Sequence, residues 1–367
     1  MASALLPVGR GRGFAQELGE SRAIFDESLS WVTESSAHTV CERITRAGFN
    51  VLMPCVWHGR GTAWPSKLAP WDSKGLEEIA SDIPGFDPLQ KLIEVAQQYQ
   101  IEVHPWFNVV MRQREFFPQF YDADSKGRNF DVHNQEFRTF ICNLMIECID
   151  RYSVHGINLD YIRSMGICAS QSCRQNYRQF NGRNLDADRL ISGVGSAARK
   201  ALSEWNEQAV SDIVQRVSTY VRKNHPNLII SVCGHPGHPD LTIQGQNSIR
   251  WADQGLIDVI YDMRYPAPPN WDEIRALQQT MKRPEAYVVL AGNYDLAGPK
   301  NAPIARDGAL VADQIARSCQ ISHGNGVGFY IYSLLNDAQI DALRKGPFRN
   351  PAKPKWVRTG SGSVSSS

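Results

Sequence analysis

Eight short, nearly uninterrupted apolar runs, each followed by a segment of helical periodicity, constrain the fold of this chain most strongly. Strands that are apolar on both faces are typical of a parallel sheet covered by helices. The expected strands are residues 22–28, 50–57, 101–108, 157–161, 228–233, 258–263, 286–291 and 327–332. The expected helices are residues 34–47, 88–99, 135–152, 204–224, 248–254, 271–282, 310–323 and 337–345. Eight strand–helix units predict an α/β fold, a single (β/α)8 TIM barrel.

One barrel domain, residues 21–350, accounts for most of the chain, with an N-terminal extension at 1–20 and a flexible tail at 351–367. The tail ends in glycine and serine, the composition of a flexible linker. Long loops are expected after the second and third strands, at residues 58–85 and 109–133. No glycine-rich phosphate-binding fingerprint follows the first strand, which argues against a dinucleotide-binding fold.

Charge and hydropathy exclude two classes of partner. The formal net charge of +1 and the charged fraction of 21% give no basic footprint for nucleic acid. No run approaches the about 18 apolar residues needed to span a bilayer. Near the N-terminus, Arg10 and Arg12 follow the short apolar patch instead of preceding it, so we expect no secretory signal peptide in this chain.

In a TIM barrel the active site lies at the C-terminal ends of the strands, and the residues there form a consistent group. They are aromatic residues, amides, carboxylates, histidines and arginines, with nothing that resembles a phosphate site. In strand order the candidates are Glu27, Trp57, His58, Trp106, Asn108, Asn158, Asp160, His235, Asp262, Arg264, Tyr265, Asn293 and Tyr332. Flat aromatic rings stack on the faces of sugars, and amides and carboxylates bind hydroxyl groups. Structural alternatives remain open: Trp57 and Trp106 could cap the barrel core, and His58 and His235 could anchor loops.

The fourth strand carries the most specific of these signals. Its sequence, residues 155–163, reads His-Gly-Ile-Asn-Leu-Asp-Tyr-Ile-Arg and places Asp160 at the strand end, three residues before Arg163. Taken alone, these two residues could equally form a structural ion pair.

The chain resembles the family-10-like glycosyl hydrolases, a bacterial barrel family related to the polyglucosamine hydrolase domain of biofilm export proteins. The resemblance spans most of residues 22–336. Four segments carry it: Ala-Gly-Phe-Asn-Val at 47–51, Trp-Pro-Ser-Lys-Leu-Ala-Pro-Trp at 64–71, His-Pro-Trp-Phe-Asn at 104–108, and the fourth strand. This chain departs from the family pattern at Ser164 and Met165, where an aromatic–proline pair is usual, and in the sixth strand, which reads Tyr-Asp-Met-Arg-Tyr at 261–265. The resemblance implies a glycoside hydrolase that is secreted or associated with the cell envelope.

Glycoside cleavage normally needs two acidic groups that flank the scissile bond. Asp160 is the candidate for the general acid if burial raises its pKa, or for the nucleophile or stabiliser if Arg163 holds it ionised. For the second carboxylate the order of preference is Asp262, Glu27 and Asp295. A substrate-assisted route that uses an N-acetyl group of the sugar would need no second acid. The expected partner is a polysaccharide or oligosaccharide. No metal or other cofactor is expected, because the strand ends lack a cluster of histidines. The alternative is a barrel that binds carbohydrate without cleaving it.

Two of the eight cysteines differ from the rest. Cys168 and Cys173 lie close together in the loop after Asp160, whereas the other six fall in apolar helices or strands and are expected in the core. A disulfide is plausible in an oxidising compartment, and a metal site built on the two thiolates would lack two ligands. The sequence leaves this choice open.

Overall fold

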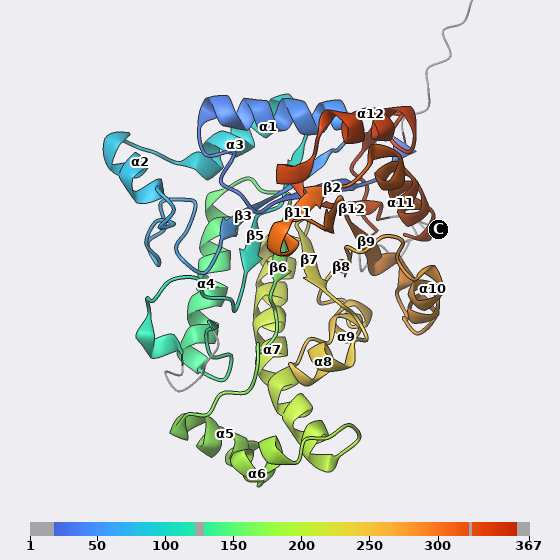
Figure 1. Cartoon of the computed structure of the whole chain (residues 1–367). Helices are drawn as coiled ribbons and strands as arrows, with labels where there is room; N and C mark the ends of the chain where they lie inside the picture. The colour runs from blue at the N-terminus through green and yellow to red at the C-terminus, as the bar shows by residue number, and fades with distance from the viewer. Residues whose placement is uncertain (1–17, 122–127, 323–324, 358–367) are drawn as a thin grey trace, which may run out of the picture.

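The computed structural model describes residues 18–121, 128–322 and 325–357 (Figure 1). The predicted extension at 1–20 and tail at 351–367 therefore lie mostly outside the described residues. The barrel strands are β2 (Arg22–Asp26), β3 (Val51–Trp57), β4 (Glu102–Val103), β5 (Trp106–Asn108), β6 (Gly156–Asp160), β7 (Ile229–Gly234), β8 (Val259–Arg264), β9 (Tyr287–Gly292) and β12 (Val327–Tyr330). Strands β4 and β5 are two pieces of one barrel strand, because both pair with β3. All neighbours are parallel, and β2 pairs with both β12 and β3, which closes the ring. The predicted TIM barrel is confirmed.

Eight helices follow the strands at the predicted places: α1 (Glu34–Ala47), α3 (Pro88–Gln98), α4 (Gln135–Arg151), α7 (Ala197–Asn224), α9 (Ser248–Asp253), α10 (Trp271–Gln279), α11 (Gly308–Ile321) and α12 (Asp337–Lys345). They form the outer layer of the barrel, in which α4 and α7 lie side by side (Figure 1). Within the described residues, none of the helices, the 28-residue α7 included, has the length and apolarity to cross a membrane.

Several elements decorate the loops and were not predicted. Four short helices are α2 (Leu76–Asp82), α5 (Gln171–Asn181), α6 (Leu185–Leu190) and α8 (Pro239–Ile243). A hairpin pairs β10 (Tyr294–Leu296) with β11 (Pro303–Ala305), and the 3-10 turns are η1 (Pro118–Phe120), η2 (Pro284–Ala286), η3 (Pro299–Asn301) and η4 (Tyr332–Leu334). The excursion that contains α5 and α6 follows β6, so the fourth strand carries a long insertion as well as the second and third.

In most of the barrel strands, alternate residues belong to two different apolar cores. In β8, for example, Val259 and Tyr261 face the barrel interior, and Ile260 faces the helices. The interior core is small, and the core between the barrel and its helices is large. This parity decides which strand-end side chains reach the mouth of the barrel.

Two glycines allow the loop after β3 to pack tightly at the mouth. Gly59 and Gly61 both have positive φ, +70° and +127°. A Cβ at Gly59 would lie 1.9 Å from the carbonyl oxygen of Met111, and a Cβ at Gly61 would lie 2.1 Å from that of Trp71. Glycine at 59 therefore lets the second-strand loop approach the third-strand loop, and glycine at 61 lets the second-strand loop fold back on itself.

The opposite end of the barrel is closed by the two ends of the described chain. Strand β1 (Leu18–Gly19) pairs with β13 (Ala352–Lys353), and Trp356 packs against the interior core. The indole Nε1 of Trp356 donates a hydrogen bond of 2.8 Å to Glu102 Oε2, at the start of a barrel strand. Residues 352–356, which we predicted to belong to a flexible tail, are thus attached to the barrel.

Candidate active site

A cavity of about 440 Å³ opens at the C-terminal ends of the strands, where the TIM barrel fold places its chemistry. Its lining combines two carboxylates with aromatic, amide and basic side chains. The lining residues are Glu27, Ser28, His58, Arg60, Lys74, Trp106, Asn108, Met111, Gln113, Asp160, Tyr161, Arg163, Met263, Tyr265, Tyr330 and Ser333. We call this cavity the barrel mouth.

Asp160 is buried in the barrel mouth, with 6% of its surface exposed. It is the last residue of β6, and its neighbour across the sheet is Asn108. The backbone N–H of Tyr161 donates to Asp160 Oδ1 at 2.6 Å. Burial raises the pKa of Asp160, and although Arg163 and the Tyr161 hydrogen bond lower it, the net pKa lies above the ordinary value for an aspartate. Of the two roles predicted for Asp160, this environment favours the proton donor.

Glu27 is the second carboxylate of the barrel mouth and lies in a different environment, because it is exposed. It follows β2 directly. The turn that holds it is fixed by the preceding Asp26, whose carboxylate accepts hydrogen bonds from Ser28 and Ser30. Oε2 of Glu27 accepts a hydrogen bond of 2.6 Å from the hydroxyl of Tyr330. Asp160 is thus a buried acid with a raised pKa, and Glu27 is an exposed carboxylate that accepts a hydrogen bond. Two carboxyl groups in such different environments can divide the roles of proton donor and ionised partner between them.

The remaining walls offer surfaces and polar atoms for a sugar. The rings of Tyr265 and Tyr330 stack with centroids 4.6 Å apart. Trp106 and Asn108 are 4% and 5% exposed, and the indole N–H of Trp106 faces Asp160, whose pKa it lowers. Among the described residues, Asn108 Oδ1 has no hydrogen-bond partner. A buried acceptor without a partner costs free energy unless a ligand satisfies it, so this oxygen suits a hydroxyl group of a bound saccharide.

Seven predicted site residues line the barrel mouth: Glu27, His58, Trp106, Asn108, Asp160, Arg163 and Tyr265. Seven others do not. Trp57 packs in the core between the barrel and its helices, where it stacks on Phe130. Asn158 is buried and donates a hydrogen bond to Ser231. Asn293 is buried against Gln339, and Tyr332 lies in the turn η4. These four residues support the fold of the strand ends and do not face the cavity.

Asp262 was the first choice for the second carboxylate, and the structure places it on the other face of β8. Its carboxylate is fully buried and accepts hydrogen bonds from Tyr287 and Arg264. His235 lies beside it, with Nδ1 3.7 Å from Asp262 Oδ1. Because Tyr261 and Met263 face the barrel axis, Asp262, Arg264 and His235 belong to a separate ionic cluster. The third choice, Asp295, forms an ion pair with Arg306. Glu27 is therefore the second carboxylate of the site.

Sequence reasoning missed Tyr330, Arg60 and Lys74 in the barrel mouth. Tyr330 is the last residue of β12, but the predicted strand ran two residues further and placed Tyr332 at its end. Arg60 and Lys74 come from the long loop after β3, which has no periodicity from which to read their direction.

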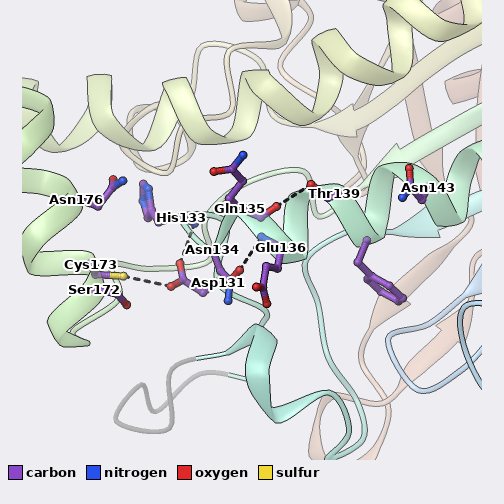
Figure 2. Close-up of a pocket in the computed structure, with 11 residues that line it drawn as sticks. Asp131, His133, Asn134, Gln135, Glu136, Thr139, Asn143, Ser172, Cys173 and Asn176 are labelled. Atoms are coloured by element: carbon purple, nitrogen blue, oxygen red, sulfur yellow. Dashed lines mark hydrogen bonds between the residues drawn. The ribbon is translucent and has the colours of Figure 1, made fainter.

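A larger hollow, of about 840 Å³, lies away from the strand ends, between the start of α4 and α5 (Figure 2). It is lined by residues that include Asp131, Asn134 and Asn176, and by none of the predicted site residues. Beside it, Cys168 and Cys173 form a disulfide, and a carboxylate oxygen of Asp131 lies 3.1 Å from Cys173 Sγ. Among the described residues these three are grouped closely enough to hold a metal ion, but the disulfide removes both thiolates as ligands.

Fold and site together define a (β/α)8 barrel with two carboxylates and aromatic walls at its mouth. The chain belongs to the glycosyl hydrolase-like 10 family, whose model matches residues 24–120 and 126–282. The glycosyl hydrolase DigH of Escherichia coli K12 is 24% identical over 257 residues, which cover 61% of this chain and 56% of DigH. The glycosyl hydrolase YngK of Bacillus subtilis is 21% identical over 199 residues, which cover 50% of this chain and 36% of YngK. The chain thus spans about half or less of the length of these relatives.

Solved structures share the fold at low sequence identity. The glycoside hydrolase domain of PgaB (BpsB) from Bordetella bronchiseptica superposes with a TM-score of 0.64 at 11% identity, covering 89% of this chain and 98% of that domain. The catalytic domain of β-amylase from Paenibacillus polymyxa gives 0.56 at 9% identity, covering 92% of this chain and all of that domain. These neighbours are glycosidases built on TIM barrels.

Proposed function

We propose that this protein hydrolyses the glycosidic bonds of a polysaccharide, with Asp160 as the general acid and Glu27 as its ionised partner. The observation that carries the proposal is the pair of carboxylates at the barrel mouth, one buried with a raised pKa and one exposed. Membership of a glycosyl hydrolase-like family supports the same reaction class.

The chemistry follows from the two environments. Asp160 donates its proton to the glycosidic oxygen. The leaving group therefore departs as a neutral alcohol and not as an anion. Positive charge develops on the other sugar ring, and the carboxylate of Glu27 faces it. A solvent water then adds to the anomeric carbon in place of the leaving group, and the proton that this water releases restores the acid form of Asp160. Tyr330 holds Glu27 by its hydrogen bond, and Tyr265 stacks on Tyr330, so the second carboxylate is fixed by a rigid aromatic pair. Asn108 orients the sugar through its unpartnered amide oxygen, and the ring of Trp106 forms part of the wall beside it.

Substitution of each carboxylate by its amide tests the proposal. Release of reducing ends is measured from a panel of neutral, amino and acidic polysaccharides. We expect Asp160→Asn and Glu27→Gln each to lower turnover by a factor of about 100 or more, because each removes a charge or proton from the reaction. Asp150→Asn, a change at an exposed carboxylate at the far end of α4, is the matched control and should leave turnover unchanged. Wild-type turnover in Asp160→Asn would exclude Asp160 as the acid.

The same panel separates catalysis from binding alone. A wild-type protein that binds one of these glycans but releases no reducing ends would be the carbohydrate-binding barrel. We prefer hydrolysis because a buried Asp160 with a raised pKa is suited to donate a proton, a step that binding alone does not need.

We propose further that the protein works outside the reducing cytoplasm. The Cys168–Cys173 disulfide supports this location, because disulfides persist in oxidising compartments. Trapping of free thiols in intact cells, followed by mass spectrometry, should find these two cysteines unmodified by the trapping reagent. Full modification of both would contradict the proposal.

A further inference from the structure

His58 lines the barrel mouth, but both of its ring nitrogens face other parts of the protein. It is 3% exposed and comes from the loop after β3. Its Nε2 lies 2.7 Å from the backbone carbonyl oxygen of Glu27. A carbonyl oxygen can only accept a hydrogen bond, so Nε2 must carry the proton. Whether the other ring nitrogen, Nδ1, also carries a proton depends on the group that it faces.

Nδ1 of His58 faces a carboxylate. It lies 3.2 Å from Asp72 Oδ2, a distance that makes an ion pair although the alignment falls short of a good hydrogen bond. Asp72 is fully buried, and its other oxygen accepts from Arg60 Nε at 2.7 Å and from the backbone N–H of Lys74 at 2.9 Å. Burial raises the pKa of Asp72, but the contacts with His58 and Arg60 together lower the pKa by more. The net pKa therefore lies below the ordinary value for an aspartate.

An ionised Asp72 decides the protonation of the ring. If Nδ1 carried no proton, its lone pair would face a buried carboxylate oxygen, and two acceptors would repel each other at 3.2 Å. A proton on Nδ1 turns the same contact into an attraction. Among the described residues, no other carboxylate forms a hydrogen bond or an ion pair with the ring. Glu27 contacts the ring through its backbone carbonyl oxygen, and its carboxylate accepts a hydrogen bond from Tyr330 instead. Arg60 lies on the far oxygen of Asp72 and extends to Gln113.

We propose that His58 is a positioning residue that carries a proton on both ring nitrogens and links Asp72 to the backbone of Glu27, so that the loop after β3 sets the place of the second carboxylate. The proposal rests on the proposed function for its catalytic consequence, but not for the protonation state. His58 then does not bind sugar itself. Asp72 and His58 act on the reaction only through Glu27, which makes residues 58–72 part of the active-site framework.

The protonation state is tested by nitrogen NMR of histidine-labelled protein, which distinguishes an imidazolium from either neutral tautomer without any substrate. We expect both ring nitrogens of His58 to carry a proton in the wild-type protein, because each of them faces an acceptor. In Asp72→Asn the amide can donate to Nδ1, so the ring should become neutral with its proton on Nε2. His58→Gln identifies the signal by its disappearance.

The exposed pair His225–Asp150 provides the matched control. Its nitrogen and oxygen lie 2.8 Å apart, but the two side chains are 32% and 46% exposed. Water can replace either partner there, so His225 supplies the reference signal for a ring in contact with solvent. A neutral His58 ring in the wild-type protein under the conditions of the activity assay would overturn the proposal, whatever the protein hydrolyses.

Kinetics test the positioning role. His58→Ala should lower kcat about 10- to 100-fold with KM changed by less than about threefold, because a displaced catalytic group affects the transition state more than binding. His58→Gln, whose amide can still donate to the Glu27 carbonyl, should recover part of kcat; His225→Gln should change neither constant. Raised KM with an unchanged kcat in His58→Ala would show that His58 binds substrate. If no wild-type hydrolysis is found, the proposed function fails and the NMR result still stands.

Discussion

The hydroxyl of Tyr330 allows the role of Glu27 to be tested with a change of a single atom. Tyr330→Phe removes the 2.6 Å hydrogen bond to Glu27 Oε2 and keeps the ring. The ring stays in place because it stacks on Tyr265 at 4.6 Å with an interplanar angle of 18°, and because its edge meets Trp106. The substitution therefore removes one interaction of the second carboxylate and leaves the aromatic wall intact.

The size of the effect follows from the nature of the bond. A hydrogen bond to a charged group contributes about 1.5–3 kcal/mol, and each 1.4 kcal/mol corresponds to a factor of about ten in rate. If the bond orients Glu27 in the transition state, kcat/KM should fall roughly 10- to 150-fold. Most of the loss should appear in kcat, because the hydroxyl contacts the carboxylate and not the substrate.

The assay is reducing-end release from the preferred polysaccharide under saturating and limiting substrate. Tyr220→Phe is the matched control, since its hydroxyl makes the same 2.6 Å contact with a carboxylate, Asp150, on the outer surface of the barrel. Thermal unfolding should be similar for both variants. A Tyr330→Phe enzyme with the kcat/KM of Tyr220→Phe would refute the argument that Glu27 must be held by this bond.

Two further predictions concern the acid and the far end of the barrel. In Arg163→Gln the burial of Asp160 is no longer opposed by the charge of Arg163, so the pKa of Asp160 should rise further and the alkaline limb of the kcat/KM profile should move to higher pH. Arg163→Lys keeps the charge and should leave the limb nearer its wild-type position; a downward shift in Arg163→Gln would contradict the assignment of the acid. Trp356→Ala should cost about 2–4 kcal/mol of unfolding free energy, since it removes a half-buried indole and its hydrogen bond to Glu102. An unchanged melting temperature would show that this residue does not hold the barrel closed.

The sequence predicted the strand–helix repeat well because each unit buries an apolar strand beneath an amphipathic helix. It also placed Asp160 and Glu27 correctly in the barrel mouth, since both stand where an apolar run stops. The helices α5 and α6 escaped notice for the opposite reason. Helix α5 buries only Cys173 and Tyr177, so its apolar stripe is too short to give a periodic signal.

The orientation of side chains at the strand ends was harder to predict. Both faces of a barrel strand are apolar, so the sequence of β8 does not tell which of Asp262 and Met263 faces the axis. The error at Tyr332 has a different cause. Alternation predicts the same face for Tyr330 and Tyr332, but the chain turns into η4 after β12 and takes Tyr332 out of the cavity.

Both ends of the described chain meet on the side of the barrel remote from Asp160 and Glu27, where β1 lies beside β13. Whatever is attached beyond residue 357 or before residue 18, whether a tag, a surface support or another domain, joins the barrel at a site away from the mouth. Immobilisation through either terminus should therefore leave a long glycan free to reach Asp160, and the protein can be presented to insoluble polysaccharide without a choice between the two ends.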